Sequence, residues 1–128
     1  MSAVRVASYL SVLDFHRLDS ACRPIRDAFG TPPYLVGLVN ERPDYRDVDV
    51  RLILLDAEYD RLTVPEWSVI GLALSAYLRD ATHLPVDFQV QRMTEANERH
   101  PGTPRNPLGM RNVRDFVGDG APTPEETP

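Results

Sequence analysis

Two stretches of alternating apolar and polar residues flank a long amphipathic segment, and this arrangement constrains the fold more than any other feature of the chain. Successive side chains of a β-strand point to opposite faces of a sheet, so alternation predicts a strand with one buried face and one polar face. Residues 47–54 and 84–91 both show this pattern and are predicted to be half-buried strands. Their apolar positions are Val48, Val50 and Leu52 in the first strand and Val86, Phe88 and Val90 in the second.

The segment between these strands carries the signals of a helix start. Thr63 and Glu66 have the spacing of a capping box, in which the side chain of each residue accepts a hydrogen bond from the backbone N–H of the other. Pro65 suits the first turn of a helix, where its missing N–H has no partner to lose. A helix is therefore predicted from this point, with apolar positions at helical spacing. These positions are Trp67, Ile70, Leu74, Tyr77 and Leu78.

The remaining segments are shorter or less regular. Residues 4–29 have apolar positions close to one helical face, but Pro24 disfavours helix at the preceding residue and is expected to kink or split the segment. Residues 34–37 predict a short strand. Residues 94–99 favour a short helical turn, whereas several prolines and a glycine make residues 100–108 irregular.

A chain of 128 residues is long enough for one domain with its own core. We expect a single domain over residues 1–118, followed by a disordered tail at residues 119–128, which is rich in proline, glycine and acidic residues. The predicted elements favour an α/β (α+β) fold, a small mixed β-sheet with helices packed mainly on one face. The polar faces of the two longer strands then lie on the open side of the sheet.

The composition excludes several functional classes. All 14 basic residues are arginines, so a P-loop lysine, a pyridoxal Schiff base and a lysine-dependent nuclease site are excluded. The net charge of −5 argues against non-specific coating of nucleic acid or acidic membranes. The single cysteine, Cys22, cannot form an internal disulfide, and neither a signal-peptide pattern nor a membrane-spanning stretch is present. These features predict a cytoplasmic protein, and arginine in place of lysine is typical of GC-rich genomes, including those of some phages.

Three carboxylates are predicted to meet on the polar side of the sheet. Asp47 and Asp49 are two residues apart on one strand, so their backbone positions lie about 6–7 Å apart on the same face. Asp87 is the one acidic residue in the other alternating strand, and it lies on the polar face. Carboxylate oxygens are ligands of hard cations such as Mg²⁺ or Mn²⁺, which stabilise charge in phosphoryl transfer. These three aspartates are the candidate metal ligands, although two aspartates with this spacing also occur on exposed strands without a metal.

The order and spacing of these motifs resemble the minimal nucleotidyltransferase family of the polymerase-beta-like superfamily. The family pattern is a strand ending in Gly-Ser, a strand with two aspartates around an apolar residue, and a later strand with one aspartate between apolar residues. The resemblance implies that Asp47 and Asp49 hold metal and nucleotide phosphates, and that Asp87 completes the metal site and helps to activate an acceptor hydroxyl. The corresponding segments of this chain are Val36-Gly37-Leu38, Asp47-Val48-Asp49-Val50 and Val86-Asp87-Phe88.

The chain departs from this family at Leu38, where the family usually has a serine that contacts a nucleotide phosphate. The other candidate nucleotide-binding residues are Gly37, at the strand end, and Arg42, Arg46 and Arg51, around the carboxylates. Arginine clamps phosphate oxygens in a planar, bidentate way, although these three could equally balance nearby acids. Arg51 is the strongest candidate because it shares a strand face with the aspartate pair.

The resemblance implies metal-dependent transfer of a nucleoside monophosphate from a nucleoside triphosphate to an acceptor, which could be a protein hydroxyl, an RNA end or a small molecule. Five arginines make residues 92–114 locally basic, which suits either phosphate contacts with a nucleic-acid acceptor or a solvated arm. Two alternatives stay open. A catalytically inactive relative, from a phage for example, would keep the fold as a binding or interaction protein, and Leu38 favours it. A metal-dependent nuclease would need similar carboxylates but no nucleoside triphosphate.

Overall fold

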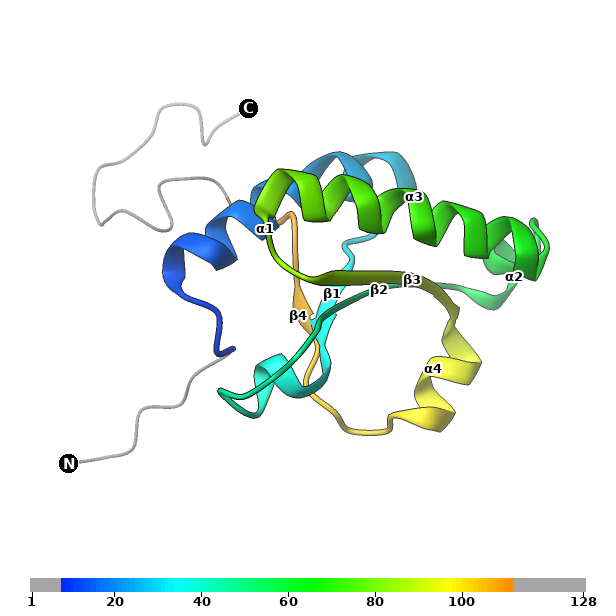
Figure 1. Cartoon of the computed structure of the whole chain (residues 1–128). Helices are drawn as coiled ribbons and strands as arrows, with labels where there is room; N and C mark the ends of the chain where they lie inside the picture. Colours follow the sequence, from blue (N-terminus) through cyan, green and yellow to red (C-terminus); the bar gives the residue numbers. More distant parts are fainter. Residues whose placement is uncertain (1–7, 112–128) are drawn as a thin grey trace, which may run out of the picture.

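The computed structural model describes residues 8–111. Within this range the chain forms a four-stranded mixed sheet in the order β3-β2-β1-β4, flanked by helices (Figure 1). The predicted α/β (α+β) class with a small mixed sheet is thereby confirmed. The elements, in chain order, are α1 (Val12–Phe29), β1 (Tyr34–Val36), the 3-10 helix η1 (Gly37–Asn40), β2 (Val48–Leu54), α2 (Asp56–Tyr59), α3 (Val64–Thr82), β3 (Val86–Arg92), α4 (Met93–Arg99) and β4 (Asn106–Pro107).

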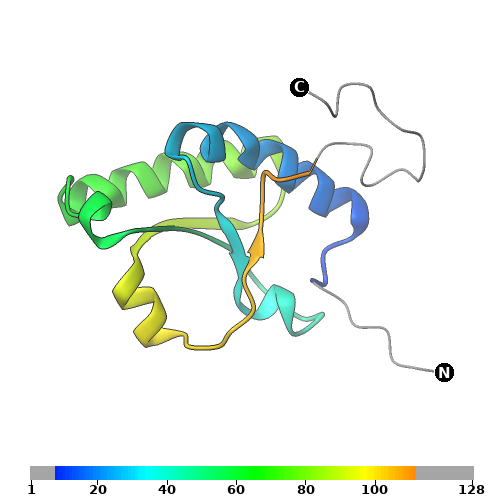
Figure 2. The same cartoon turned by 180° about the vertical axis from the view of Figure 1, so that it is seen from behind.

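The sheet combines one parallel pair with two antiparallel pairs. β2 and β3 are parallel, with Val48 opposite Val86 and Asp49 opposite Asp87. Parallel strands need a long crossover, and α3 supplies it between β2 and β3. β1 is antiparallel to both β2 and β4, and Figure 2 shows the short β4 beside β1. Because partners in register point to the same side, the polar positions of β2 and β3 share one face of the sheet.

The two long helices cover the apolar face of the sheet. Both views show α1 and α3 side by side on one side of the strands and α4 on the other (Figures 1 and 2). The predicted apolar positions of β2 and the first half of β3 are almost completely buried, and burial of each such side chain contributes about 1.5–3 kcal/mol. The helices contribute Leu18 and Leu78, which are fully buried in the same core.

The start of α3 confirms the predicted capping box. The Thr63 N–H donates to Glu66 Oε1 at 2.8 Å, and Thr63 Oγ1 accepts from the Glu66 N–H at 3.2 Å. Such caps satisfy backbone groups that have no partner within the helix, and an N-cap is worth about 1 kcal/mol. The helix ends at Thr82, and the left-handed conformation of the C-cap residue His83 (φ 61°) turns the chain towards β3.

The first helix differs from the prediction at Pro24. α1 is one continuous helix through this residue, so the expected split is wrong. Pro24 has no N–H to donate to the carbonyl of Ser20, one turn earlier. Both residues are exposed, so water can donate a hydrogen bond to that carbonyl instead. The buried face of the helix, which includes Leu18, Cys22 and Ile25, packs on the core and holds the helix together. The helix begins only after the cap residue Ser11, and residues 4–7 of the predicted segment lie outside the described residues.

The shorter elements agree with the sequence only in part. The helical turn expected at residues 94–99 is present as α4, while the segment expected to be irregular contains β4. α2 and η1 had no signal in the sequence pattern. The tail at residues 119–128 lies outside the described residues. No helix in the described part of the chain is long and apolar enough to cross a membrane.

Candidate functional site

Two aspartates lie side by side on the open face of the sheet. Asp49 on β2 is opposite Asp87 on β3, and Val36 on β1 is opposite Asp49 on its other side. The parallel register therefore brings together two carboxylates that are 38 residues apart in sequence. Both side chains are partly exposed, Asp49 at 29% and Asp87 at 39%, so they remain accessible to a ligand.

Arg51 lies between the two carboxylates. Its Nη2 is 3.2 Å from Asp87 Oδ2 and 3.8 Å from Asp49 Oδ1. Its Nη1 donates to the backbone carbonyls of Asp87, at 2.7 Å, and Val50, at 3.0 Å. With 13% of its side chain exposed, this guanidinium is a fixed positive charge of the site.

The pKa of Asp49 is raised above its ordinary value of 3.8, and burial is the main cause. Arg51 acts in the opposite direction, but the negative charges of Asp87 and Asp47 add to the effect of burial. Burial and the neighbouring carboxylates together therefore outweigh the effect of Arg51 on the pKa of Asp49.

The turn after β1 lies in close contact with the side chain of Asp49. Gly37 has a φ of +81°, and a Cβ atom at this position would lie 2.5 Å from Asp49 Oδ2. Only glycine allows both this backbone conformation and this close approach. The glycine that the sequence pattern singled out thus has a direct physical role, which is to admit the Asp49 carboxylate beside the strand end.

The other predicted site residues lie at the edge of the site or outside it. Asp47 precedes the first residue of β2 and is exposed, although its charge acts on Asp49. Leu38 is in η1 and 50% exposed. Arg42 is exposed and pairs with Asp44 at 2.7 Å, and Arg46 is exposed without an ion pair in the described part of the chain. No three His, Cys, Asp or Glu side chains within residues 8–111 are grouped closely enough to hold a metal ion, so the three-carboxylate centre stays a prediction.

A cavity of about 440 Å³ opens between this site and the segment after β3. Gly37, Leu38, Asp49 and Arg51 line one end of it. The opposite wall comes from α4 and the loop that follows, and these residues had no motif in the sequence beyond the local excess of arginine. They are Ala96, Arg99, His100, Thr103 and Arg105, with Ile53, Gln89 and Gln91 between the two ends.

Asp56 in α2 fixes the start of α4. Its Oδ1 accepts from the Thr94 N–H at 3.0 Å and its Oδ2 from Thr94 Oγ1 at 2.5 Å. These hydrogen bonds, together with nearby Arg92, lower the pKa of Asp56. Since α4 has no capping side chain of its own, Asp56 supplies the cap from 38 residues away.

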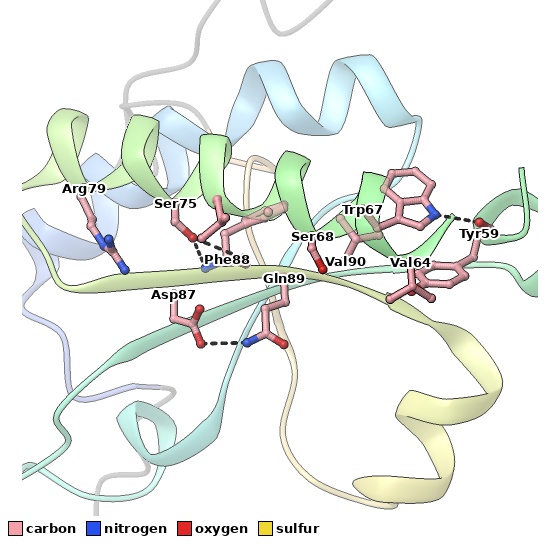
Figure 3. Close-up of a pocket in the computed structure, with 12 residues that line it drawn as sticks. Tyr59, Val64, Trp67, Ser68, Ser75, Arg79, Asp87, Phe88, Gln89 and Val90 are labelled. Atoms are coloured by element: carbon pink, nitrogen blue, oxygen red, sulfur yellow. Dashed lines mark hydrogen bonds between the residues drawn. The ribbon is translucent and has the colours of Figure 1, made fainter. Parts of the chain in front are cut away.

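A second hollow, of about 480 Å³, lies between α3 and the outer edge of β3 (Figure 3). There Ser75 Oγ accepts from the Phe88 N–H at 2.8 Å and lies 3.3 Å from the Phe88 carbonyl, while Arg79 Nε donates to the Val86 carbonyl at 2.8 Å. These side chains satisfy backbone groups that an edge strand leaves unpaired. Figure 3 also shows Asp87 and Gln89 on the side of β3 away from α3, towards the open face.

The sequence matches no known protein family, and comparisons with curated proteins and with solved structures find no significant match. Function is therefore inferred from the site itself.

Proposed function

We propose that this chain is a metal-dependent nucleotidyltransferase, which transfers a nucleoside monophosphate from a nucleoside triphosphate to an acceptor. The observation that carries the proposal is the in-register pair of Asp49 and Asp87 on the open face of the sheet, where Asp49 lines a cavity of about 440 Å³. That volume lies within the range of about 300–1,000 Å³ typical of small-molecule sites. The glycine turn against Asp49 supports it, because the order of glycine turn, paired aspartates and later aspartate is the family pattern that the sequence resembles.

The carboxylates fit a divalent cation such as Mg²⁺ or Mn²⁺. Hard cations prefer oxygen ligands, and the parallel register places the oxygens of Asp49 and Asp87 on the same face of the sheet. Asp49 and Asp87 would hold the ion, and Asp47 would join them from the start of the same strand. When bound, such an ion neutralises phosphate charge and stabilises the leaving pyrophosphate.

Asp87 is suited to accept a proton from the acceptor hydroxyl. Its Oδ2 accepts hydrogen bonds from Arg51 at 3.2 Å and from Gln89 at 3.1 Å, which orient the carboxylate. Its Oδ1 takes part in no hydrogen bond among residues 8–111 and is available to an acceptor. A general base must reach the proton that it removes, and this free oxygen meets that requirement on the open face.

Incubation of the full chain with each labelled nucleoside triphosphate tests the proposal. The reactions contain Mg²⁺, Mn²⁺ or EDTA, and candidate acceptors of three kinds: protein hydroxyls, RNA ends and small molecules. Metal-dependent labelling of an acceptor that Asp87→Asn abolishes would support the proposal. Asp44→Asn is the matched control, since this carboxylate is exposed and pairs with Arg42 outside the cavity. Equal labelling by the wild type and Asp87→Asn would contradict it.

A catalytically inactive interaction protein of the same fold is the second candidate. Two observations favour it: Arg51 already supplies a counter-charge to both carboxylates, and Leu38 replaces the phosphate-contacting serine of the family. A ligand that binds only the folded state raises its thermal stability. An unchanged melting temperature with millimolar Mg²⁺ and nucleotide would favour this candidate. Cleavage of labelled nucleic acid with Mg²⁺ alone would instead indicate a nuclease.

A further inference from the structure

The turn after β1 is a poor place for phosphate in this protein. Leu38 offers an apolar side chain there, and it is half exposed at the edge of the cavity. Glu41 and Asp49 line the same end, and both are acidic. The space beside Gly37 is filled by the Asp49 carboxylate. A polyanion placed here finds no hydroxyl donor, and the one nearby guanidinium in the described part of the chain, Arg51, is already paired with Asp49 and Asp87.

The opposite wall of the cavity has the complementary chemistry. We define the cationic wall as Arg99 and Arg105, which come from the end of α4 and the loop that follows. The side chain of Arg99 is 67% exposed, and its Nη2 lies 3.9 Å from Glu95 Oε1. An ion pair this exposed contributes little to stability. Its guanidinium is therefore free to bind an anion.

Arg105 is positioned in advance for such a role. Its Nη2 donates to Asn97 Oδ1 at 3.0 Å and approaches the Ala96 carbonyl at 3.4 Å, which holds the side chain against α4. Its Nη1 and Nε donors make no hydrogen bond within residues 8–111. Arginine binds phosphate through a planar fork of donors, and here the fork is fixed while part of it remains open.

The floor between the two ends suits the rest of a nucleotide. Ile53 and Ala96 are buried and apolar, and Gln91 adds an amide without a hydrogen-bond partner in the described part of the chain. A ligand that reaches from the carboxylates to the cationic wall would cross this floor. The lining of the cavity thus combines the carboxylates of Asp49 and Glu41 with arginines from α4 and the loop that follows.

We infer that the cationic wall, and not the turn after β1, binds the polyphosphate of the nucleotide. The identity of the ligand as a nucleoside triphosphate rests on the proposed function, whereas the affinity of the wall for polyphosphate does not. The wall replaces the phosphate contact that Leu38 cannot make.

Binding of inorganic tripolyphosphate to the full chain in EDTA, measured by calorimetry, tests this inference. Arg99→Gln and Arg105→Gln are each expected to weaken binding about tenfold, the loss that corresponds to one charge-assisted hydrogen bond. Arg23→Gln removes an exposed arginine from α1, on the other side of the sheet, and Leu38→Ser restores the hydroxyl of the family. Both are expected to leave the affinity within about twofold of the wild type. Tighter binding by Leu38→Ser together with unchanged binding by Arg99→Gln would overturn the inference.

A double variant, compared with Arg99→Gln, separates this inference from the proposed function. Arg99 is exposed and its ion pair with Glu95 lies on the surface, so Arg99→Gln is expected to fold normally even if Arg105→Gln loosens the loop. The double variant Asp49→Asn, Asp87→Asn is expected to keep tripolyphosphate binding while it loses any transfer activity. If the protein shows no transfer activity but binds tripolyphosphate through the cationic wall, the proposed function is refuted and the inference about the wall is supported. If the wild type and Arg99→Gln both show transfer activity with the same KM for nucleotide, the proposed function is supported and the inference about the cationic wall is overturned.

Discussion

Burial and two neighbouring carboxylates raise the pKa of Asp49, and only Arg51 opposes them, so the surroundings of this side chain disfavour its charged form. Asp49→Asn removes the charge but keeps the shape of the side chain. We expect the free energy of unfolding at pH 7 to rise, by up to about 1 kcal/mol, the scale of partly exposed charge interactions. Urea unfolding with and without Mg²⁺ measures it, and only the wild type is expected to gain stability from the metal.

The pH dependence of this effect follows from linkage. A carboxyl whose pKa is raised on folding binds its proton more tightly in the folded state, so it costs stability once the pH exceeds its unfolded value, near 3.8. The advantage of Asp49→Asn should therefore disappear below that pH and reach its full size above the raised folded pKa. A loss of stability in the variant at pH 7 would identify Asp49 as a structural residue.

Gly37 should tolerate no side chain because of both its conformation and its neighbour. Gly37→Ala combines a positive φ with a Cβ atom 2.5 Å from Asp49 Oδ2, and we expect a loss of about 2–4 kcal/mol. Gly30→Ala is the matched control, since Gly30 has a φ of +74° but nothing within 4 Å of the added Cβ, and about 1 kcal/mol should be lost. Denaturant unfolding of both variants isolates the contact with Asp49. Equal losses would mean that the carboxylate moves aside freely.

At the scale of elements, the predictable parts were those that depend on nearby residues. The Thr63 capping box acts over three residues, and the alternation around Val50 and Phe88 reports burial directly, so both could be recognised in the sequence. The cap that Asp56 provides for Thr94 joins residues 38 apart, and the basic wall at Arg105 exists only because the sheet and α4 enclose a cavity. Such features depend on tertiary packing, which a local pattern does not encode.

The cap between α2 and α4 makes a prediction about the mobility of the cavity wall. Asp56→Asn weakens the hydrogen bonds that Thr94 donates, so amide hydrogen exchange in α4 should become several-fold faster while β2 and β3 keep their protection. The pKa of Asp56 is lowered in the folded state, so this cap is fully present above pH 3.8 and is lost as the pH falls through the folded pKa. The wild type and the variant should therefore converge in acid. Asp80→Asn, an exposed carboxylate on α3, serves as the control. Faster exchange throughout the sheet would indicate global rather than local destabilisation.

At the scale of the whole molecule, the segment that carries the cationic wall is anchored at both ends. Upstream, Asp56 holds the start of α4. Downstream, β4 pairs with β1, and the chain then reaches α1. There the fully buried Asp19 accepts hydrogen bonds from the Gly109 N–H at 2.9 Å and from Arg111 Nη1 at 3.0 Å. The guanidinium of Arg111 also lies 5.0 Å from the ring centroid of Phe15. An ion pair between the buried Asp19 and the partly exposed Arg111, on the other side of the sheet from the carboxylate site, thus helps to set the position of one wall of the cavity.

Asp19→Ala is the test of this anchor. It leaves the buried Gly109 N–H and the partly buried Arg111 N–H without their acceptor, and a buried donor left unpaired costs about 1–3 kcal/mol. Asp27→Ala, which removes an exposed carboxylate 3.7 Å from Arg26, should change stability by less than about 0.5 kcal/mol. If the anchor positions the wall, Asp19→Ala should also weaken tripolyphosphate binding at temperatures where the variant remains folded. Thermal unfolding followed by calorimetry below the transition measures both effects. If Asp19→Ala is destabilised but binds tripolyphosphate with unchanged affinity, Asp19 only holds the end of the chain on α1. If the variant is as stable as the wild type, the contacts of Asp19 contribute nothing to the stability of the fold.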